Sequence, residues 1–308
     1  MLKSASLAAL CGLTLAATAQ TPETRRTPPE ATAAKSPVVS LNHFFVVLDA
    51  PSYAAMQSDP YLTHTFAPFE KRTTVRSDST YTAAYWYGRQ TYFEIFEPPS
   101  QGPRGASGIA FSVDGEGESA AIEALWKTSL GDTQSASVTR KTEDAEPVWF
   151  KMTAGKSQAA ETGAGLRLWL MEYDRNFLAG WYPNLTKERG KTRGPVLDRY
   201  VAKIGKSKER ETAVVGDIKE LLLALDDADR ALLIRHLVPA GWQRSDRDIL
   251  SLRGPDGATI KVIPKEGARR GIIEVAFHVQ GSPAPHEATL GSVKLTVTPT
   301  EARLRFVP

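Results

Sequence analysis

Cysteine is almost absent from this chain: Cys11 is the single cysteine among 308 residues. It lies within an N-terminal segment that has the features of a signal peptide, so the mature protein is predicted to contain no thiol. That excludes disulfides, cysteine-based metal sites and cysteine nucleophiles from the mature chain. Export suits such a chain, because it has no thiol to protect from oxidation.

Several other features that would indicate a particular function are missing. The 38 basic residues nearly balance the 35 acidic ones, for a formal net charge of +3, and this balance does not indicate a nucleic-acid partner. After the N-terminal segment, no stretch approaches the ~18 consecutive apolar residues of a membrane helix. The sequence also lacks the G-x-S-x-G elbow of hydrolases, a Walker phosphate loop and the H-E-x-x-H zinc motif.

Residues 1–19 are predicted to be a signal peptide. Lys3 supplies a positive charge, residues 5–17 are mostly small and apolar, and Ala17-Thr18-Ala19 is typical of an A-x-A cleavage site. We expect the mature chain to begin at Gln20 and the protein to be exported to the periplasm or the outside of a bacterial cell. The alternative is a buried N-terminal helix. Residues 20–37, rich in Pro, Thr, Ala and charge, are predicted to be a disordered linker.

The rest of the chain repeats a pattern of a strand, a crossover and further strands. Copies start near Val39, Gly108, Gly216 and Gly271, and the last copy shows no helical segment. We therefore predict an α+β protein built from two halves, residues 38–181 and residues 213–308. Residues 182–212 are charged, glycine-rich at first and helical in pattern later. They are predicted to be a connection or a surface arm.

His43 is an ionisable residue in a predicted strand that is mostly apolar. Alternation along the strand places it on the same face as Leu41 and Phe45. By the same rule, Glu94 and Glu172 each lie on an otherwise apolar face, where a buried carboxylate needs a partner or a proton. A histidine and two carboxylates from separate strands would suit a divalent ion such as Fe(II), Mn(II), Ni(II) or Zn(II). The alternative is structural, with hydrogen bonds or Arg and Tyr partners in the core.

Four stretches carry a resemblance to a known superfamily. They are LNHFFVVLD at 41–49, GRQTYFEIFEP at 88–98, SGIAFSVD at 107–114 and LRLWLMEYD at 166–174. Together they resemble the vicinal oxygen chelate (VOC) superfamily, which includes glyoxalase I, ring-cleaving extradiol dioxygenases and bleomycin-resistance proteins. From about Leu41 to the C-terminus, including FEKRTTVRSD and YTAAYWYGRQTYFE, the chain is also similar to a VOC-like bacterial family of unknown function.

The resemblance implies a fold and a set of site residues. The fold would be repeated βαβββ-type modules that form curved mixed sheets in two halves. The metal ligands would be His43, Glu94 and Glu172, and the fourth ligand position falls on Gly108, which has no side chain to offer. Three ligands still permit a metal ion, but metal-free binding members of the superfamily are also compatible with this set.

A basic segment and an aromatic segment are further candidates for ligand binding. Arg72 and Arg76 lie in a crossover predicted for residues 61–76, and an arginine there could hold a carboxylate or phosphate group. The alternative is a solvated basic loop. Tyr85, Tyr87 and Tyr92 belong to a dense run of aromatic residues that could line an apolar pocket. They could equally form cross-strand pairs in a hairpin.

Three functions follow as hypotheses. The first is a divalent-metal-dependent enzyme of the glyoxalase or dioxygenase type that acts on a small molecule. The second is a metal-free small-molecule-binding protein of the bleomycin-resistance type. The third is an envelope interaction protein that uses the arm at residues 182–211. The sequence does not indicate an oligomeric state.

Overall fold

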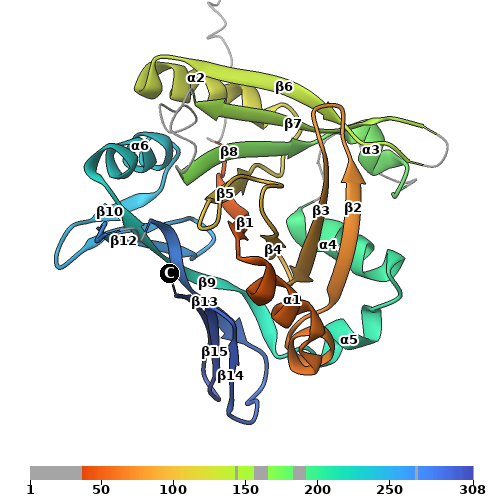
Figure 1. The fold of residues 1–308 in the computed structure, drawn as a ribbon. Helices are drawn as coiled ribbons and strands as arrows, with labels where there is room; N and C mark the ends of the chain where they lie inside the picture. The colour runs from red at the N-terminus through yellow and green to blue at the C-terminus, as the bar shows by residue number, and fades with distance from the viewer. Residues whose placement is uncertain (1–36, 143–144, 156–165, 183–191, 268–269, 308) are drawn as a thin grey trace, which may run out of the picture. The chain divides into compact units, whose positions relative to one another are not determined.

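Two eight-stranded mixed sheets form the framework of the computed structural model, which describes residues 37–307 apart from 143–144, 156–165, 183–191 and 268–269. The first sheet has the strand order β2-β3-β4-β1-β5-β8-β7-β6 (Figure 1), and the second has the order β10-β11-β12-β9-β13-β16-β15-β14. The first contains β1 (Ser40–Val47), β2 (Phe69–Val75), β3 (Thr80–Tyr87), β4 (Tyr92–Phe96), β5 (Ser107–Ser112), β6 (Thr133–Thr139), β7 (Val148–Gly155) and β8 (Leu166–Tyr173).

The second sheet contains β9 (Val215–Leu225), β10 (Gln243–Ser245), β11 (Leu250–Arg253), β12 (Thr259–Pro264), β13 (Gly271–Val279), β14 (His286–Leu290), β15 (Val293–Val297) and β16 (Ala302–Phe306). The helices are α1 (Ala50–Ser58), the π-helical η1 (Leu62–Phe66), α2 (Glu118–Leu130), α3 (Arg175–Ala179), α4 (Arg193–Lys203), α5 (Ser207–Thr212) and α6 (Asp227–Leu237). No helix among the described residues is long and apolar enough to cross a membrane.

The predicted repeat is confirmed. Each sheet consists of two modules, and the first strands of the two modules pair antiparallel. β1 pairs with β5 in the first sheet, and β9 pairs with β13 in the second. In the first three modules a helical crossover lets the last strand run parallel to the first, as β1–β4, β5–β8 and β9–β12 do. The fourth module has no helix between β13 and β14, so β16 runs antiparallel to β13.

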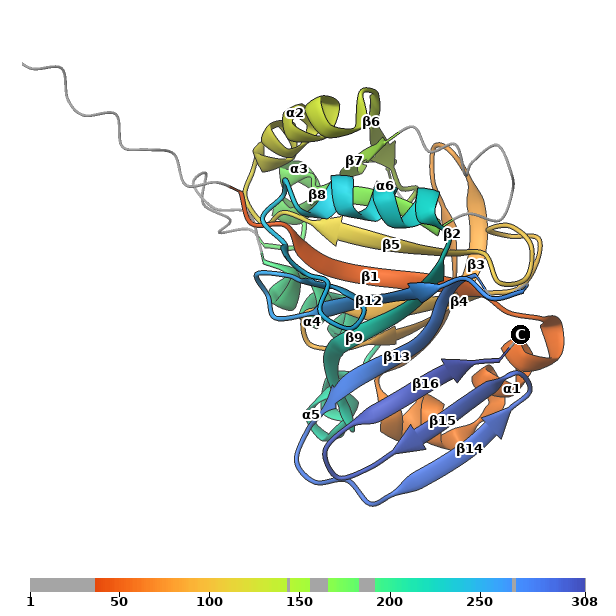
Figure 2. The ribbon, with the colours of Figure 1, turned by 90° about the vertical axis from the view of Figure 1, so that its left-hand side faces the viewer.

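Helix α1 of the first module packs beside the strands of the fourth, which has no helix of its own. The Ser52 hydroxyl accepts a hydrogen bond from the backbone N–H of Ser292 at 2.8 Å, and Tyr61 stacks on His286 with ring centroids 3.8 Å apart. Gly291 is needed at this contact, since a Cβ there would be 2.3 Å from the Ser52 hydroxyl oxygen. Figure 2 shows α1 next to β14, β15 and β16.

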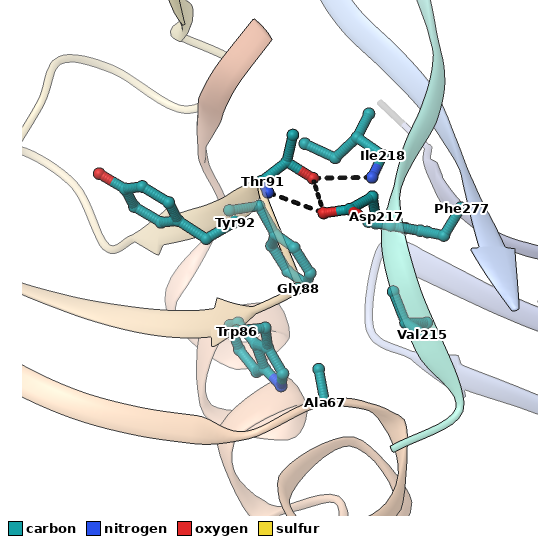
Figure 3. Close-up of a pocket in the computed structure, with 10 residues that line it drawn as sticks. Ala67, Trp86, Gly88, Thr91, Tyr92, Val215, Asp217, Ile218 and Phe277 are labelled. Atoms are coloured by element: carbon teal, nitrogen blue, oxygen red, sulfur yellow. Dashed lines mark hydrogen bonds between the residues drawn. The ribbon is translucent and has the colours of Figure 1, made fainter. Parts of the chain in front are cut away.

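Polar contacts join the two sheets at the start of β9. The Asp217 carboxylate accepts a hydrogen bond from the backbone N–H of Gln90 at 2.6 Å and another from that of Thr91 at 2.8 Å, and Figure 3 draws the second. The Thr91 hydroxyl donates to the same carboxylate and accepts from the backbone N–H of Ile218. The cavity beside these groups has a volume of about 10 Å³, which is room for one water molecule at most. This contact therefore joins the halves and is not a ligand site.

The apolar side chains divide into two clusters on opposite faces of the first sheet. Phe44 and Val46 of β1 belong to the cluster shared with α1, α2 and the second sheet, whereas Phe45 and Val47 point to the other face. We call this other face the cavity face. His43 lies on it with Phe45, as predicted, but Leu41 does not, because a β-bulge between Leu41 and His43 shifts the register.

Two predicted connecting segments contain more regular structure than expected. The crossover predicted for residues 61–76 contains η1 and then strand β2, so Arg72 lies within a sheet. The predicted surface arm contains α4, whose Val196, Leu197, Tyr200 and Val201 are buried on the cavity face. Helix α4 of the arm is therefore packed into the protein, because the first sheet covers its apolar stripe. The domain boundaries stay a prediction, since Pro37–Pro308 forms a single compact unit.

Candidate functional site

A cavity of about 60 Å³ opens on the cavity face of the first sheet. It is lined by His43, Phe45, Arg76, Tyr81, Tyr92, Glu94, Phe96, Gln101, Trp149, Phe150, Trp169 and Met171. These side chains come from β1, β3, β4, β7 and β8 and from two loops, so both modules of the sheet contribute. The cavity thus combines aromatic walls with one imidazole, one carboxyl group and one guanidinium group.

The cavity holds His43 as a neutral imidazole with a free lone pair. Its Nδ1 lies 2.8 Å from the side-chain oxygen of Asn42, and because that oxygen can only accept, Nδ1 carries the proton. Tyr92 stacks on the ring at 4.3 Å, and Trp169 meets it edge-on at 5.3 Å. Burial, aided by the charge of Arg76, lowers the pKa of His43 to about 3. The Nε2 atom is therefore a lone-pair acceptor at neutral pH.

Glu94 faces that lone pair from the adjacent strand. Its Oε1 atom lies 3.8 Å from Nε2 of His43, a contact too long for a direct hydrogen bond. Burial raises the pKa of Glu94 to about 7, although Arg72 and Arg76 act in the opposite direction. Because His43 is neutral, the two groups do not form an ion pair at neutral pH. They are instead a proton donor or acceptor and a lone pair, and both residues line the same cavity.

Arg76 supplies the positive charge at the cavity wall. Its guanidinium donates to the Asp78 carboxylate through Nε at 2.8 Å and Nη2 at 2.6 Å. Its carbon Cζ lies 5.4 Å from the centre of the Phe150 ring and 5.9 Å from that of Tyr81. The side chain is 16% exposed, so its charge acts mainly on the buried groups around it.

Three of the predicted ligand-binding residues lie outside the cavity lining. Arg72 donates to the Glu70 carboxylate at 2.8 Å and to the Tyr87 hydroxyl at 3.1 Å. Its guanidinium also lies 4.3 Å from the ring centre of Tyr85 and 5.5 Å from that of Tyr200 of α4. The structure therefore places Arg72, Tyr85 and Tyr87 in a packed ion-pair and aromatic cluster under α4. Arg76 and Tyr92 are the two predicted residues that do line the cavity.

Glu172 does not join His43 and Glu94. Its carboxylate accepts the backbone N–H groups of Gly117 and Ser119 at 2.7 and 2.8 Å, at the N-terminus of α2. There it satisfies donors that a helix start leaves unpaired, and it meets the positive end of the helix dipole. The leucine face that Glu172 continues is the helix-covered face of β8. The cavity receives Trp169 and Met171 from that strand instead.

Gly108 occupies the remaining predicted ligand position, and aromatic rings fill the space beside it. A Cβ on Gly108 would be 2.4 Å from Cε1 of Phe45 and 2.8 Å from Cζ3 of Trp169. Both rings line the cavity. The module that begins with β5 therefore contributes apolar and aromatic surface to the site where the resemblance placed ligands.

The family of the chain is shown by comparison with known families. The profile of a family of unknown function, DUF5829, matches residues 41–306. The chain belongs to this family. A comparison with curated proteins gives no match.

Solved structures resemble this DUF5829 protein at low identity. A hypothetical protein from Staphylococcus aureus aligns with a TM-score of 0.51 and 6% identity, over 82% of this chain and 95% of that one. An Mn(II)-bound glyoxalase from Novosphingobium aromaticivorans aligns at 0.44 and 12% identity, over 86% and 80%. The 2,3-dioxygenase LapB from Pseudomonas sp. KL28 aligns at 0.44 and 12% identity, over 89% and 93%.

The fold that the sequence resemblance implied is confirmed: paired modules form two VOC-like mixed sheets. The described residues do not support a three-ligand metal centre. Among the described residues, no group of three His, Cys, Asp or Glu side chains could hold a metal ion. His43 and Glu94 converge, but Glu172 and Gly108 contribute no further ligand, and Arg76 adds a like charge nearby. The described residues therefore do not fit a resident metal held by three protein ligands.

Proposed function

We propose that this protein binds a small organic molecule in the cavity between His43, Glu94 and Arg76, without a resident metal ion, and that Glu94 exchanges a proton with it. One observation carries the proposal. A neutral imidazole and a carboxyl group with a pKa of about 7 face each other across 3.8 Å in an aromatic-lined cavity. Aromatic walls with a few convergent polar groups are typical of small-molecule sites.

The chemistry of the cavity follows from these two groups. A carboxyl group whose pKa is close to neutral pH can act as general acid or general base, because both protonation states are populated. The Nε2 lone pair of His43 can accept a hydrogen bond from the same ligand atom or from a bridging water. Asn42 fixes the tautomer that keeps Nε2 unprotonated. These residues can therefore bind and orient a ligand and exchange a proton with it.

The function is tested by thermal unfolding of the protein from Gln20 onward, with a panel of small amides, alcohols, phenols and carboxylates. We expect at least one chemical class to raise the melting temperature of the parent protein and of Glu172→Gln, whose carboxyl group lies on the other face. The His43→Ala and Glu94→Ala variants should lose that response. A panel without any effect on the parent protein would contradict the proposal.

Metal analysis of the same samples tests the hypothesis of a metal-dependent enzyme. Near-stoichiometric Fe, Mn, Ni or Zn in the parent protein, lost in both His43→Ala and Glu94→Ala, would replace this proposal with the metal-dependent one. The missing ligands would then come from water, from the substrate or from outside the described residues. We expect no bound metal at stoichiometric level.

We further propose that the protein is exported, which N-terminal sequencing of the mature chain at Gln20 would test. The envelope interaction hypothesis depended on the arm at residues 182–211. It loses support, because α4 packs its apolar side chains against the first sheet.

A further inference from the structure

We infer that the ligand of this cavity is a small monocarboxylate of about four to six nonhydrogen atoms, held by Arg76 and by the acid form of Glu94. This inference rests on the proposed function of the same cavity and names its ligand class. It depends on three features of the described residues: the size of the cavity, the donors of Arg76 and the charges that surround Glu94.

The size of the cavity limits the ligand. A site for one water molecule takes roughly 10–15 Å³ on the scale on which this cavity measures about 60 Å³. The space therefore accepts about four to six nonhydrogen atoms. The rings of Phe45, Trp149 and Trp169 form part of its lining, so a ligand with a phenyl ring would have to displace aromatic side chains that are already packed.

Arg76 supplies donors for a carboxylate. A guanidinium has five N–H groups, and two of them bond Asp78, which leaves three for Tyr81 and a ligand. The Asp78 side chain is 46% exposed, whereas that of Arg76 is 16% exposed. Water thus screens the charge of Asp78 more than that of Arg76. The cavity side of the pair retains positive character, and arginine is the side chain suited to bidentate binding of a carboxylate.

The other groups around Glu94 leave this positive charge largely unopposed. Arg72 of β2 adds a second positive charge that its ion pair with Glu70 partly offsets, and His43 of β1 is neutral. The surrounding tyrosines stay protonated because burial raises the pKa of each of them. They are Tyr81 and Tyr85 of β3, Tyr92 of β4 and Tyr173 of β8. Glu94 is then the only group in this set whose charge changes near neutral pH.

The charge state of Glu94 couples anion binding to protons. A carboxylate ligand is repelled by ionised Glu94, but it can accept a hydrogen bond from protonated Glu94. Binding should therefore take up a proton when it occurs near or above pH 7, and the affinity should fall as pH rises through that value. In Glu94→Gln the side chain stays neutral, so the pH dependence should disappear.

Isothermal titration calorimetry on the full mature chain tests the inference with acetate, glyoxylate and pyruvate, and with acetamide as the uncharged analogue of acetate. We expect 1:1 binding of at least one carboxylate, at least tenfold tighter than acetamide and three- to tenfold tighter at pH 6 than at pH 8. Arg76→Gln should weaken it at least tenfold. Arg140→Gln is the matched control, because Arg140 lies over the ring of the cavity residue Trp149 but donates to Tyr200, and its effect should stay within twofold.

Circular dichroism establishes that each variant is folded, and Arg76→Lys, which keeps the charge, decides the question if Arg76→Gln does not fold. Carboxylate binding equal to that of acetamide, or unaffected by the Arg76 variants, would overturn the ligand class. The cavity function would survive that result if acetamide binding were lost in His43→Ala and Glu94→Ala. The absence of heat from all four compounds, together with no stabilisation in the wider thermal panel, would overturn both proposals.

Discussion

Gly108 lies directly against the ring of Phe45 at the centre of the first sheet, so that a Cβ at this position would be 2.4 Å from Cε1 of Phe45. The two residues are also cross-strand partners in the pairing of β1 with β5. Phe45 lines the cavity, and its ring in turn meets Trp169 with centroids 6.0 Å apart. The absence of a side chain at residue 108 therefore makes room for the aromatic wall of the site.

Gly108→Ala is expected to destabilise the protein by about 1–3 kcal/mol, because an added methyl group in a packed core forces side chains from their preferred rotamers. It should also weaken ligand binding, since the rings that must shift line the cavity. Urea denaturation and calorimetry measure the two effects. Gly216→Ala at the start of the third module is the matched control, because a Cβ there meets its nearest neighbours at 3.6 Å. Equal stability of the two variants would contradict the packing role of Gly108.

Glu172 is expected to support stability and not ligand binding. Glu172→Gln weakens two charge-assisted hydrogen bonds to the backbone of α2 and should destabilise the protein by about 1–3 kcal/mol. Its affinity for cavity ligands should remain within twofold of the parent value. Glu94→Gln should show the reverse pattern for ligands, with altered affinity or altered pH dependence. Loss of ligand binding in Glu172→Gln, in a folded protein, would place this residue back in the site.

The architecture could be predicted from the sequence because it depends on local signals that repeat. Four strand-initial segments and helical spacing in three crossovers are sufficient to predict paired modules, and the starts of β1, β5, β9 and β13 lie within one residue of the predicted ones. The direction of β16 is a consequence of the missing fourth helix. The position of α1 over the fourth module is a long-range packing choice that no local pattern encodes.

The site was only partly predictable because face assignments depend on register. His43 and Glu94 line one cavity, since alternation holds on β4 and on β1 beyond its bulge. Glu172 shares a face with the leucines of β8, as alternation predicts, but alternation does not give which face of the sheet that is, and here it is the face opposite His43 and Glu94. The leucines before Glu172 were a usable signal for a helix-covered face, and Trp169 between them was the residue to assign to the cavity.

The unfolding free energy of Glu94→Gln, relative to that of the parent protein, is expected to rise as the pH rises. Burial raises the folded-state pKa of Glu94 from 4.5 to about 7, so its protonated form stabilises the native state fully below pH 4.5, and this contribution is lost as pH rises to about 7. Glutamine cannot ionise, so the variant does not lose this contribution to stability as the pH rises. The unfolding free energy of the variant relative to the parent should therefore rise by up to about 3 kcal/mol between pH 4.5 and pH 8. A difference that does not change with pH would mean that Glu94 titrates normally.

His43 is expected to act in the opposite direction and over a lower pH range. Its folded-state pKa is lowered from 6.5 to about 3, so its contribution is fully present above pH 6.5 and is lost as pH falls toward 3. His43→Asn cannot gain a proton, and from pH 7 to pH 4.5 it should recover about 2–3 kcal/mol relative to the parent. Between pH 4.5 and 6.5 the two residues oppose each other in the parent, so their effects separate only in single variants.

His236 is a buried histidine outside the cavity, and it can be compared with His43 to separate a role in ligand binding from a role in the core. Burial also lowers its pKa, to about 4, and its Nδ1 lies 2.8 Å from the Leu232 carbonyl within α6, away from the cavity lining. His236→Asn should therefore reduce the loss of stability in acid much as His43→Asn does. Only the His43 variant should change the affinity for a cavity ligand, because only His43 presents its Nε2 lone pair to Glu94. If both variants bound ligand like the parent, the acid sensitivity of His43 would be a property of the core alone.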